Sequence, residues 1–133
     1  MYYESNMKFS NAARQYEAIT KMFPNKKKYF YKLIENGKKF TVKKIIVKSQ
    51  GKLSLQSLDY RSEHWIVVQG KAEVTINDEV TILEENQRAF IPQKAKHRLA
   101  NNEDKDLILI EVWFGDNLDE EDIIRYEDVY SRK

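Results

Sequence analysis

The stretch that decides the fold runs from Leu53 to Gly70 and reads LSLQSLDYRSEHWIVVQG. It begins as a β-like segment, turns through a polar patch and continues as the apolar strand Trp65–Val68 before Gly70. A second stretch, NQRAFIPQKAKHRLAN from Asn86 to Asn101, follows later in the chain. Each combines a short strand with polar side chains.

Short strands also surround these stretches. The pair Asn77-Asp78 predicts a tight hairpin, because both residue types tolerate the positive φ angles of a type I′ turn. On either side of it, Val74, Ile76, Val80 and Ile82 alternate with polar residues, as in a sheet with one buried face. Further strands are expected at 29–34, 89–92, 97–100 and 107–114. Many short strands separated by turn signals predict an all-β sandwich or barrel.

Two segments near the N-terminus have their own patterns. Residues 10–23 predict a helix, because apolar side chains recur on one face and Pro24 ends the pattern. Residues 40–47 predict a long strand with its apolar residues at Phe40, Val42, Ile45 and Val47. The change of phase between Val42 and Ile45 indicates a β-bulge.

Composition narrows the class of protein. At 133 residues the chain is long enough for one domain. No apolar run is long enough for a transmembrane helix, and residues 1–10 lack the apolar core of a signal peptide, so a cytoplasmic protein without a membrane partner is expected. Zero cysteines exclude disulfides and thiolate metal sites. Residues 1–60 carry 13 Lys/Arg against 4 Asp/Glu, but no nucleic-acid motif accompanies them, so no nucleic-acid partner is expected.

The phrases quoted above resemble those of the cupin superfamily. In particular, they resemble the cupin domain of type II mannose-6-phosphate isomerases, which usually follows a mannose-1-phosphate guanylyltransferase domain. The first stretch matches LSLQ-x-H-x-H-R-[AS]-E-H-W, and the tail from Leu118 to Arg132 resembles the closing phrase of that family. The resemblance implies a jelly-roll β-barrel at 28–133 with an irregular or helical C-terminal tail. Together with the helix predicted above, residues 1–27 are expected to form a short helical extension.

The resemblance also implies a metal site, which this sequence fills incompletely. A cupin site usually takes two His and one carboxylate from the first motif and one His from the second. The matching positions here are Leu58, Tyr60, Glu63 and His97, so only Glu63 and His97 remain as ordinary ligands. Two protein ligands are fewer than the three of usual catalytic zinc sites, so Zn, Mn or Fe would have an incomplete site.

Three functions are compatible with these residues. The first is a sugar-phosphate isomerase of the mannose-6-phosphate type in polysaccharide biosynthesis, with Glu63 or His97 as the base. The second is a metal-free isomerase or epimerase of sugar nucleotides that pairs His97 with Tyr60. The third is a non-catalytic sugar-binding cupin. The candidates for holding an anionic substrate are Gln56, Lys43, Lys44, Arg61, Lys96 and Arg98.

The expected partners are a small sugar phosphate or nucleotide sugar and a second copy of the chain. The resemblance implies a homodimer, and the apolar strand Tyr29–Ile34 would need cover if it lies at a sheet edge.

Overall fold

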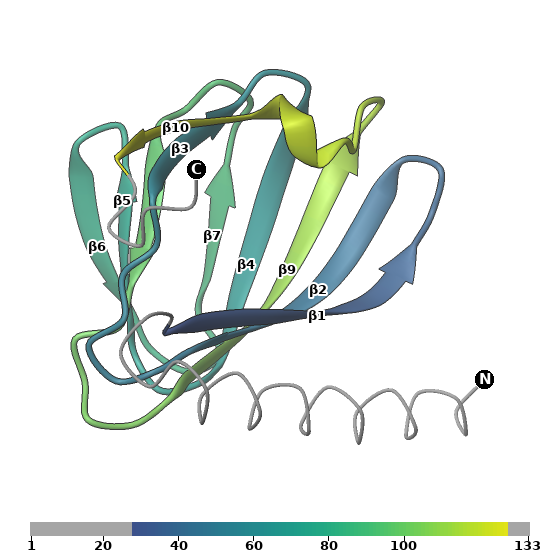
Figure 1. Ribbon diagram of the computed structural model, residues 1–133. Helices are drawn as coiled ribbons and strands as arrows, with labels where there is room; N and C mark the ends of the chain where they lie inside the picture. The colour runs from purple at the N-terminus through teal and green to yellow at the C-terminus, as the bar shows by residue number, and fades with distance from the viewer. Residues whose placement is uncertain (1–27, 128–133) are drawn as a thin grey trace, which may run out of the picture.

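The computed structural model describes residues 28–127, and these form two facing antiparallel sheets (Figure 1). The first sheet has the strand order β1-β2-β9-β4-β7 and the second has the order β10-β3-β8-β5-β6. The strands are β1 (Tyr29–Asn36), β2 (Phe40–Val47), β3 (Leu55–Leu58), β4 (Arg61–Gln69), β5 (Ala72–Ile76), β6 (Glu79–Leu83), β7 (Arg88–Ile91), β8 (His97–Ala100), β9 (Leu107–Gly115) and β10 (Ile123–Glu127). This is the all-β jelly-roll architecture that the sequence predicts.

The core lies between the two sheets. Strands β4 and β9 are neighbours at the centre of the first sheet, and their inward residues Val67, Leu107 and Leu109 are fully buried. Val74 and Leu99 meet them from the second sheet. Burying a side chain of this size stabilises the fold by roughly 1.5–3 kcal/mol. The central strands therefore form one well-packed wall of the barrel, and the candidate site lies at one end of this wall.

Two local predictions can be compared with the backbone. The β5–β6 hairpin turns at Asn77 and Asp78 with φ angles of 46° and 72°, which confirms the predicted type I′ turn. The bulge predicted in residues 42–45 is wrong, because β2 pairs with β9 without a register shift from Phe40 to Val47. The inward residues of β2 are Thr41, Lys43, Ile45 and Val47, so its regular alternation includes two polar side chains.

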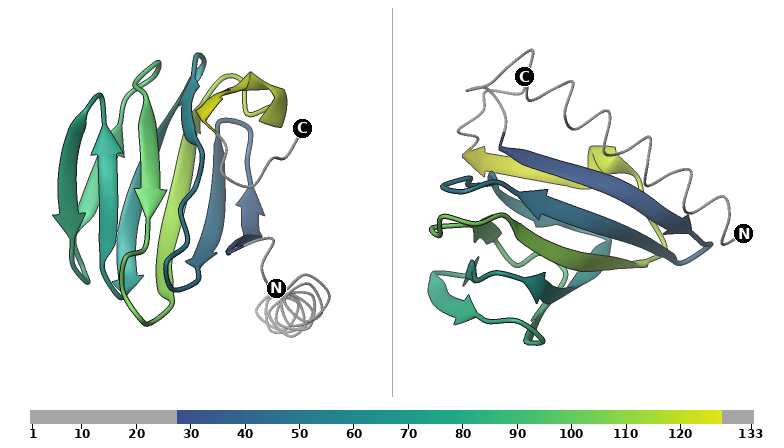
Figure 2. Two further views of the ribbon diagram at one scale, coloured as in Figure 1. Left: turned by 60° about the vertical axis from the view of Figure 1, so that its left-hand side comes forward. Right: turned by 90° about the horizontal axis from the view of Figure 1, so that it is seen from below.

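The tail joins the second sheet. After Gly115 the chain forms a 3₁₀ turn, η1 (Glu120–Asp122), and then the edge strand β10 beside β3 (Figure 2). The tail that was expected to be irregular or helical therefore ends its described part as a strand. The helix predicted at 10–23 lies outside the described residues. Within 28–127, no helix has the length and apolarity needed to cross a membrane.

Candidate functional site

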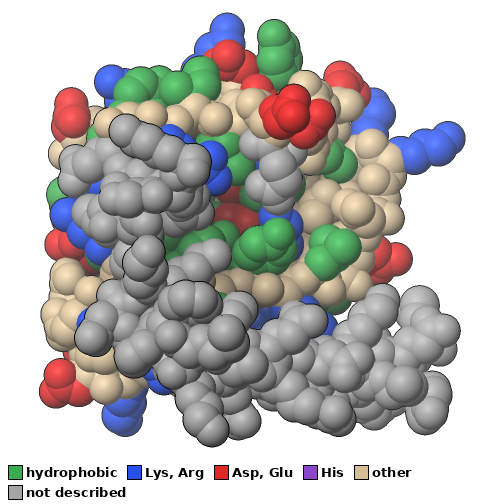
Figure 3. Space-filling view, in the orientation of Figure 1, with side chains coloured by type: hydrophobic (Ala, Val, Ile, Leu, Met, Phe, Trp, Pro, Cys, Tyr) green, Lys and Arg blue, Asp and Glu red, His purple; other side chains and the backbone are tan. Residues whose placement is uncertain are grey.

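A cavity of about 220 Å³ lies between the sheets, and its mouth opens between the edge strands β1 and β10. Tyr29 and Tyr31 of β1 line one side of the cavity, and Ile123 and Arg125 of β10 line the other. Figure 3 shows acidic atoms at the bottom of a recess in this face, with hydrophobic and basic side chains around them. The wall of the cavity is formed by inward residues of β2, β4 and β9, and the opposite side by β3 and β8.

A crossed pair of Glu-x-Trp segments forms the floor. Strand β4 carries Glu63 and Trp65, and β9 carries Glu111 and Trp113. The antiparallel register places Glu63 opposite Trp113 and Trp65 opposite Glu111. Each indole donates to the carboxylate opposite it: Trp113 Nε1 lies 2.6 Å from Glu63 Oε1, and Trp65 Nε1 lies 2.9 Å from Glu111 Oε2. Both buried carboxyl groups are therefore held in fixed positions on the rigid sheet.

Glu63 and His97 form a buried ion pair across the cavity. His97 Nε2 lies 2.7 Å from Glu63 Oε2, and His97 Nδ1 lies 3.0 Å from the Ala95 carbonyl oxygen. Burial alone would raise the pKa of Glu63, but the hydrogen bond and charge of His97 hold it below the ordinary carboxyl value. Burial would likewise lower the pKa of His97, but Glu63 raises it above the ordinary imidazole value. Both shifts favour the ionised form of the pair, with imidazolium against carboxylate.

The pKa of Glu111 is shifted in the direction opposite to that of Glu63. Burial, together with the negative charge of Glu63, raises its pKa well above the ordinary carboxyl value. Lys43 of β2 lies directly opposite Glu111 in the register, and its charge partly offsets this effect. The floor thus holds two neighbouring carboxyl groups, of which Glu63 ionises easily and Glu111 retains its proton to higher pH.

Lys43 is the cation that points into the cavity from β2. Its Nζ lies 3.5 Å from the centroid of the Trp113 ring and 4.3 Å from that of Tyr31. Lys44, the predicted substrate-binding lysine, points to the outer face of the sheet, because successive residues of a strand alternate sides. Of these two lysines, the structure thus places Lys43 and not Lys44 at the cavity.

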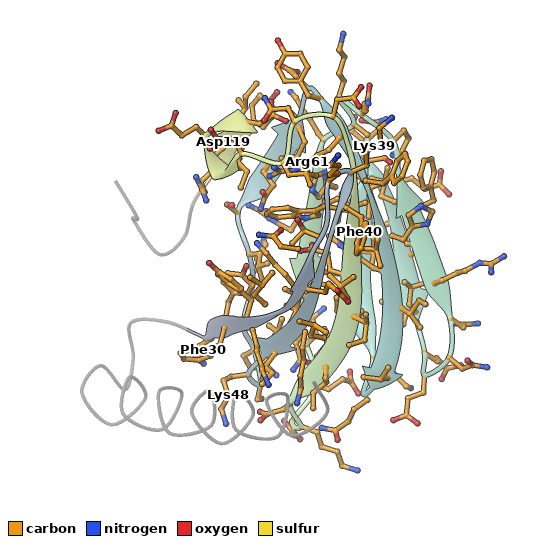
Figure 4. All side chains as sticks on the ribbon, turned by 90° about the vertical axis from the view of Figure 1, so that its right-hand side faces the viewer. Phe30, Lys39, Phe40, Lys48, Arg61 and Asp119 are labelled. Atoms are coloured by element: carbon orange, nitrogen blue, oxygen red, sulfur yellow. The ribbon has the colours of Figure 1, made fainter. Side chains whose placement is uncertain are left out.

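Arg61 is buried behind the floor. Its side chain is 0% exposed, its Cζ lies 3.7 Å from the Trp113 ring centroid, and its Nη1 donates to the Asp119 carbonyl oxygen at 2.8 Å (Figure 4). Arg61 is not among the residues that line the cavity. It attaches the segment before η1 to the barrel and lies against the Trp113 ring.

Tyr60 lies outside the cavity. The turn between β3 and β4 breaks the alternation, so Leu58 is buried but the Tyr60 side chain is 58% exposed. The carboxylate of Asp122 accepts hydrogen bonds from the backbone N–H groups of Asp59 and Tyr60 and fixes this turn. Tyr60 and His97 are therefore not brought together as the metal-free sugar-nucleotide hypothesis requires.

The remaining predicted residues lie at the cavity. Gln56 of β3 and Arg98 of β8 both line it, and Arg98 Nε donates to the Leu53 carbonyl oxygen at 3.0 Å. Arg125 of β10 adds a further cation at the mouth. The positive side chains of the cavity are arranged around the Glu63–His97 pair, which is neutral as a unit.

The residues present do not fit the divalent metal that a cupin site usually holds. In the part of the chain from 28 to 127, no three His, Cys, Asp or Glu side chains are grouped to hold a metal ion. The two remaining ligands, Glu63 and His97, are bonded to each other, and each has its second polar atom bonded elsewhere in the wall. The two other matching positions are the apolar Leu58 and the outward Tyr60.

Sequence reasoning named Lys43 only as one of several basic candidates, and it missed Glu111 and Trp113 as site residues. The phase change in residues 40–47 marks inward polar residues and not a bulge. For Glu111, the signal was a charged residue in the middle of the apolar run Leu107–Phe114. The Glu-x-Trp spacing, which occurs on both β4 and β9, was a further signal for Glu111 and Trp113.

The family described as "Mannose-6-phosphate isomerase C-terminal" matches residues 13–128. The chain belongs to this family. Among the curated relatives of this chain is the "Xanthan biosynthesis protein XanB" of Xanthomonas campestris pv. campestris (strain B100). It is 52% identical to this chain over 102 residues, which cover 77% of this chain and 22% of the relative. The "Alginate biosynthesis protein AlgA" of Pseudomonas aeruginosa is 49% identical, over 77% of this chain and 21% of the relative. The chain thus spans about a fifth of the length of these relatives.

Solved structures confirm the cupin fold of this family member. The cupin domain of Schizosaccharomyces pombe Cnp3 matches with a TM-score of 0.65 at 13% identity, covering 68% of this chain and 66% of that chain. An uncharacterised Klebsiella pneumoniae protein with a "double-stranded beta-helix domain" matches with a TM-score of 0.68 at 17% identity. The match covers 78% of this chain and 83% of that chain.

The raised pKa of Glu111 predicts a pH-dependent effect of removing its charge. Because the folded-state pKa exceeds the unfolded one, the stability linked to Glu111 is complete below the ordinary carboxyl value and is lost as pH rises through the raised pKa. Glu111→Gln mimics the protonated carboxyl and can still accept from Trp65. Its melting temperature relative to the parent should therefore increase as the pH rises from the ordinary carboxyl value through the raised pKa of Glu111. Glu79→Gln, at an exposed position on β6, is the control. Parallel curves for the parent and Glu111→Gln would contradict this assignment.

Proposed function

We propose that this chain binds a phosphorylated hexose in the barrel and interconverts its aldose and ketose forms without a bound metal. The observation that carries the proposal is the pair of neighbouring carboxyl groups whose pKa values are shifted in opposite directions. Such pairs separate the roles of ionised stabiliser and proton-transferring group within one site. A raised carboxyl pKa suits a general base that works near neutral pH.

Glu111 is the proton-transferring group in this proposal. Its carboxylate removes the proton from C2 of the aldose. The electron pair of the C2–H bond forms the C1=C2 double bond, and the π electron pair of the C1 carbonyl moves to its oxygen. The resulting enediolate is held by the Lys43 ammonium group, which lies opposite Glu111 in the sheet register. The hydroxyl proton passes from O2 to O1, and Glu111 returns its proton to C1 to give the ketose. The step consumes no oxidant or reductant.

The charge of the cavity supports an anionic substrate. Lys43, Arg98 and Arg125 line it, and the Glu63–His97 pair adds no net charge. Arginine forks match phosphate oxygens in two-point hydrogen bonds, so Arg98 and Arg125 are the groups proposed to hold the phosphate. The sugar end would then lie deeper, over the Glu-x-Trp floor.

The test is turnover of mannose 6-phosphate by the purified chain after treatment with EDTA. We expect formation of fructose 6-phosphate. In D2O we also expect incorporation of deuterium at C1 of the ketose, the carbon to which Glu111 returns a proton. Glu111→Gln and Lys43→Met should each lower kcat/KM by at least about 100-fold. Lys44→Met, the adjacent lysine on the outer face, is the matched control and should leave turnover unchanged. The rate should rise as pH increases through the raised pKa of Glu111.

A specific observation favours a second function, non-catalytic binding of the same class of ligand. Glu63 Oε1 accepts from Trp113 and its Oε2 is ion-paired with His97 Nε2, while His97 Nδ1 contacts the Ala95 carbonyl oxygen, as in a purely structural pair. Binding of mannose 6-phosphate in calorimetry that Lys43→Met weakens, without turnover or deuterium exchange, would select this function and reject the isomerase.

A further inference from the structure

Three polar side chains form a row on the inner face of the second sheet. Gln56 of β3 lies opposite Arg125 of β10 on one side and opposite His97 of β8 on the other. Residues that lie opposite each other in antiparallel strands project from the same face of the sheet, and all three side chains line the cavity. The row therefore runs from the edge strand β10 at the mouth, which lies beside β3 in Figure 1, to the buried Glu63–His97 pair.

Gln56 is the neutral member of this row. Its side chain is half-buried, and its Nε2 donates to the hydroxyl oxygen of the buried Ser54 at 3.3 Å. This bond uses the donor end of the amide. Within the described residues 28–127, no group donates to the acceptor end, Oε1. Gln56 therefore offers a hydrogen-bond acceptor to a ligand in the cavity.

The acceptor of Gln56 differs in chemistry from its neighbour at the mouth. The guanidinium group of Arg125 only donates, so it matches the oxygens of an ionised phosphate. An amide carbonyl oxygen does not bind those oxygens, because both groups are acceptors. It requires a donor, and the donors of a sugar phosphate are its hydroxyl groups. The row therefore fits a ligand that carries a hydroxyl group directly beside its phosphate end.

The spacing of the row indicates which hydroxyl group reaches Gln56. Adjacent strands lie about 4.8 Å apart, so Gln56 lies one such step deeper than Arg125, a residue proposed to hold the phosphate. In the ring form of a hexose 6-phosphate, O5 is the ring oxygen and carries no proton. The hydroxyl group closest to the phosphate along the ring is therefore the one on C4. With the phosphate at Arg125, this hydroxyl group lies at the depth of Gln56.

We propose that Gln56 is a specificity-determining residue, whose carbonyl oxygen accepts a hydrogen bond from the C4 hydroxyl group of a hexose 6-phosphate. This inference rests on the proposed function, because it takes the position of the phosphate from it. A sugar that lacks this hydroxyl group leaves Oε1 of Gln56 without a donor in a half-buried site. Such a loss should weaken binding by at least about 10-fold.

Calorimetry with the whole chain tests the proposal, with mannose 6-phosphate and 4-deoxymannose 6-phosphate as the two ligands. We expect the parent to bind the 4-deoxy compound at least about 10-fold more weakly. Gln56→Met keeps the length of the side chain but removes the amide, so it should bind both ligands with equal affinity. Gln93→Met, at an exposed position outside the cavity, is the matched control and should keep the preference of the parent. Circular dichroism checks that each variant is folded.

Ser54→Ala covers the case in which Gln56→Met fails to fold. Loss of the Ser54 hydroxyl group releases the Gln56 amide to rotate, so the preference for mannose 6-phosphate should decrease while binding of the 4-deoxy compound is unchanged. Equal affinities in the parent, or an undiminished preference in the folded variant, would overturn the role of Gln56 and leave the proposed function standing. A parent that binds neither ligand would overturn the proposed function, and the role of Gln56 with it.

Discussion

Replacement of Glu63 by glutamine is expected to lower the free energy of unfolding at pH 7 by about 3–5 kcal/mol. The side chain is buried, and its Oε2 lies 2.7 Å from His97 Nε2. The amide can still accept the hydrogen bond from Trp113, so packing and that contact are retained. What is lost is the negative charge that keeps a buried imidazolium favourable. Urea denaturation followed by far-ultraviolet circular dichroism measures the change.

The pH dependence of this loss in stability separates the contribution of the Glu63 charge from that of the shape of its side chain. The folded-state pKa of Glu63 is lowered, so its contribution is present above the ordinary carboxyl value and is lost as pH falls through the lowered pKa. The difference between the parent and Glu63→Gln should therefore decrease towards acid pH. Glu79→Gln, which removes an exposed carboxylate, should stay within about 0.5 kcal/mol of the parent at all pH values. A Glu63→Gln variant as stable as this control would show that the ion pair contributes nothing.

Truncation of Trp113 to alanine is expected to cost a similar amount, about 3–5 kcal/mol. The ring is buried, its Nε1 donates to Glu63, and two cations, Lys43 and Arg61, lie over it. Trp113→Phe keeps an aromatic ring but leaves Glu63 without this donor, so it should cost about 1–3 kcal/mol. The gap between the two variants measures the contribution of the ring.

Tyr60→Ala is the control for Trp113, since it truncates an aromatic side chain that lies outside the cavity. Its effect on the free energy of unfolding should stay below about 1 kcal/mol. Equal losses for Trp113→Phe and Trp113→Ala would mean that the hydrogen bond, and not the ring, dominates at this position.

The sequence predicted the fold well because the local signals agree with the final structure. The turn at Asn77-Asp78, the alternation around it and the short strands all contribute to the two sheets. Prediction of the site was less complete. Glu63 and His97 were predicted from motifs, whereas Glu111 was missed because apolar residues alone were used to assign the inward face of its strand. A polar residue on an inward face disturbs such an assignment, and in this barrel those residues form the cavity wall.

Tyr60 and Arg61 show a second reason why the site was predicted less completely than the fold. Strand alternation places residues reliably only while the strand continues, and the turn after Leu58 reverses the direction of the next side chain. The backbone of Tyr60 and Arg61 also packs closely against Gly115, where an added Cβ would lie 2.9 Å from Arg61 Cα. Such long-range contacts depend on how β9 meets β4 and cannot be read from residues 53–70.

The crossed Glu-x-Trp pairs also give the molecule an internal optical probe. The chain contains two tryptophans, and each indole N–H is bonded to one of the two coupled carboxyl groups. A change in the charge of a carboxylate bonded to an indole alters the electric field on that ring. The emission of the native chain should thus record the ionisation of both acids without any label, Trp113 for Glu63 and Trp65 for Glu111. Ligands that displace either hydrogen bond would be visible in the same signal.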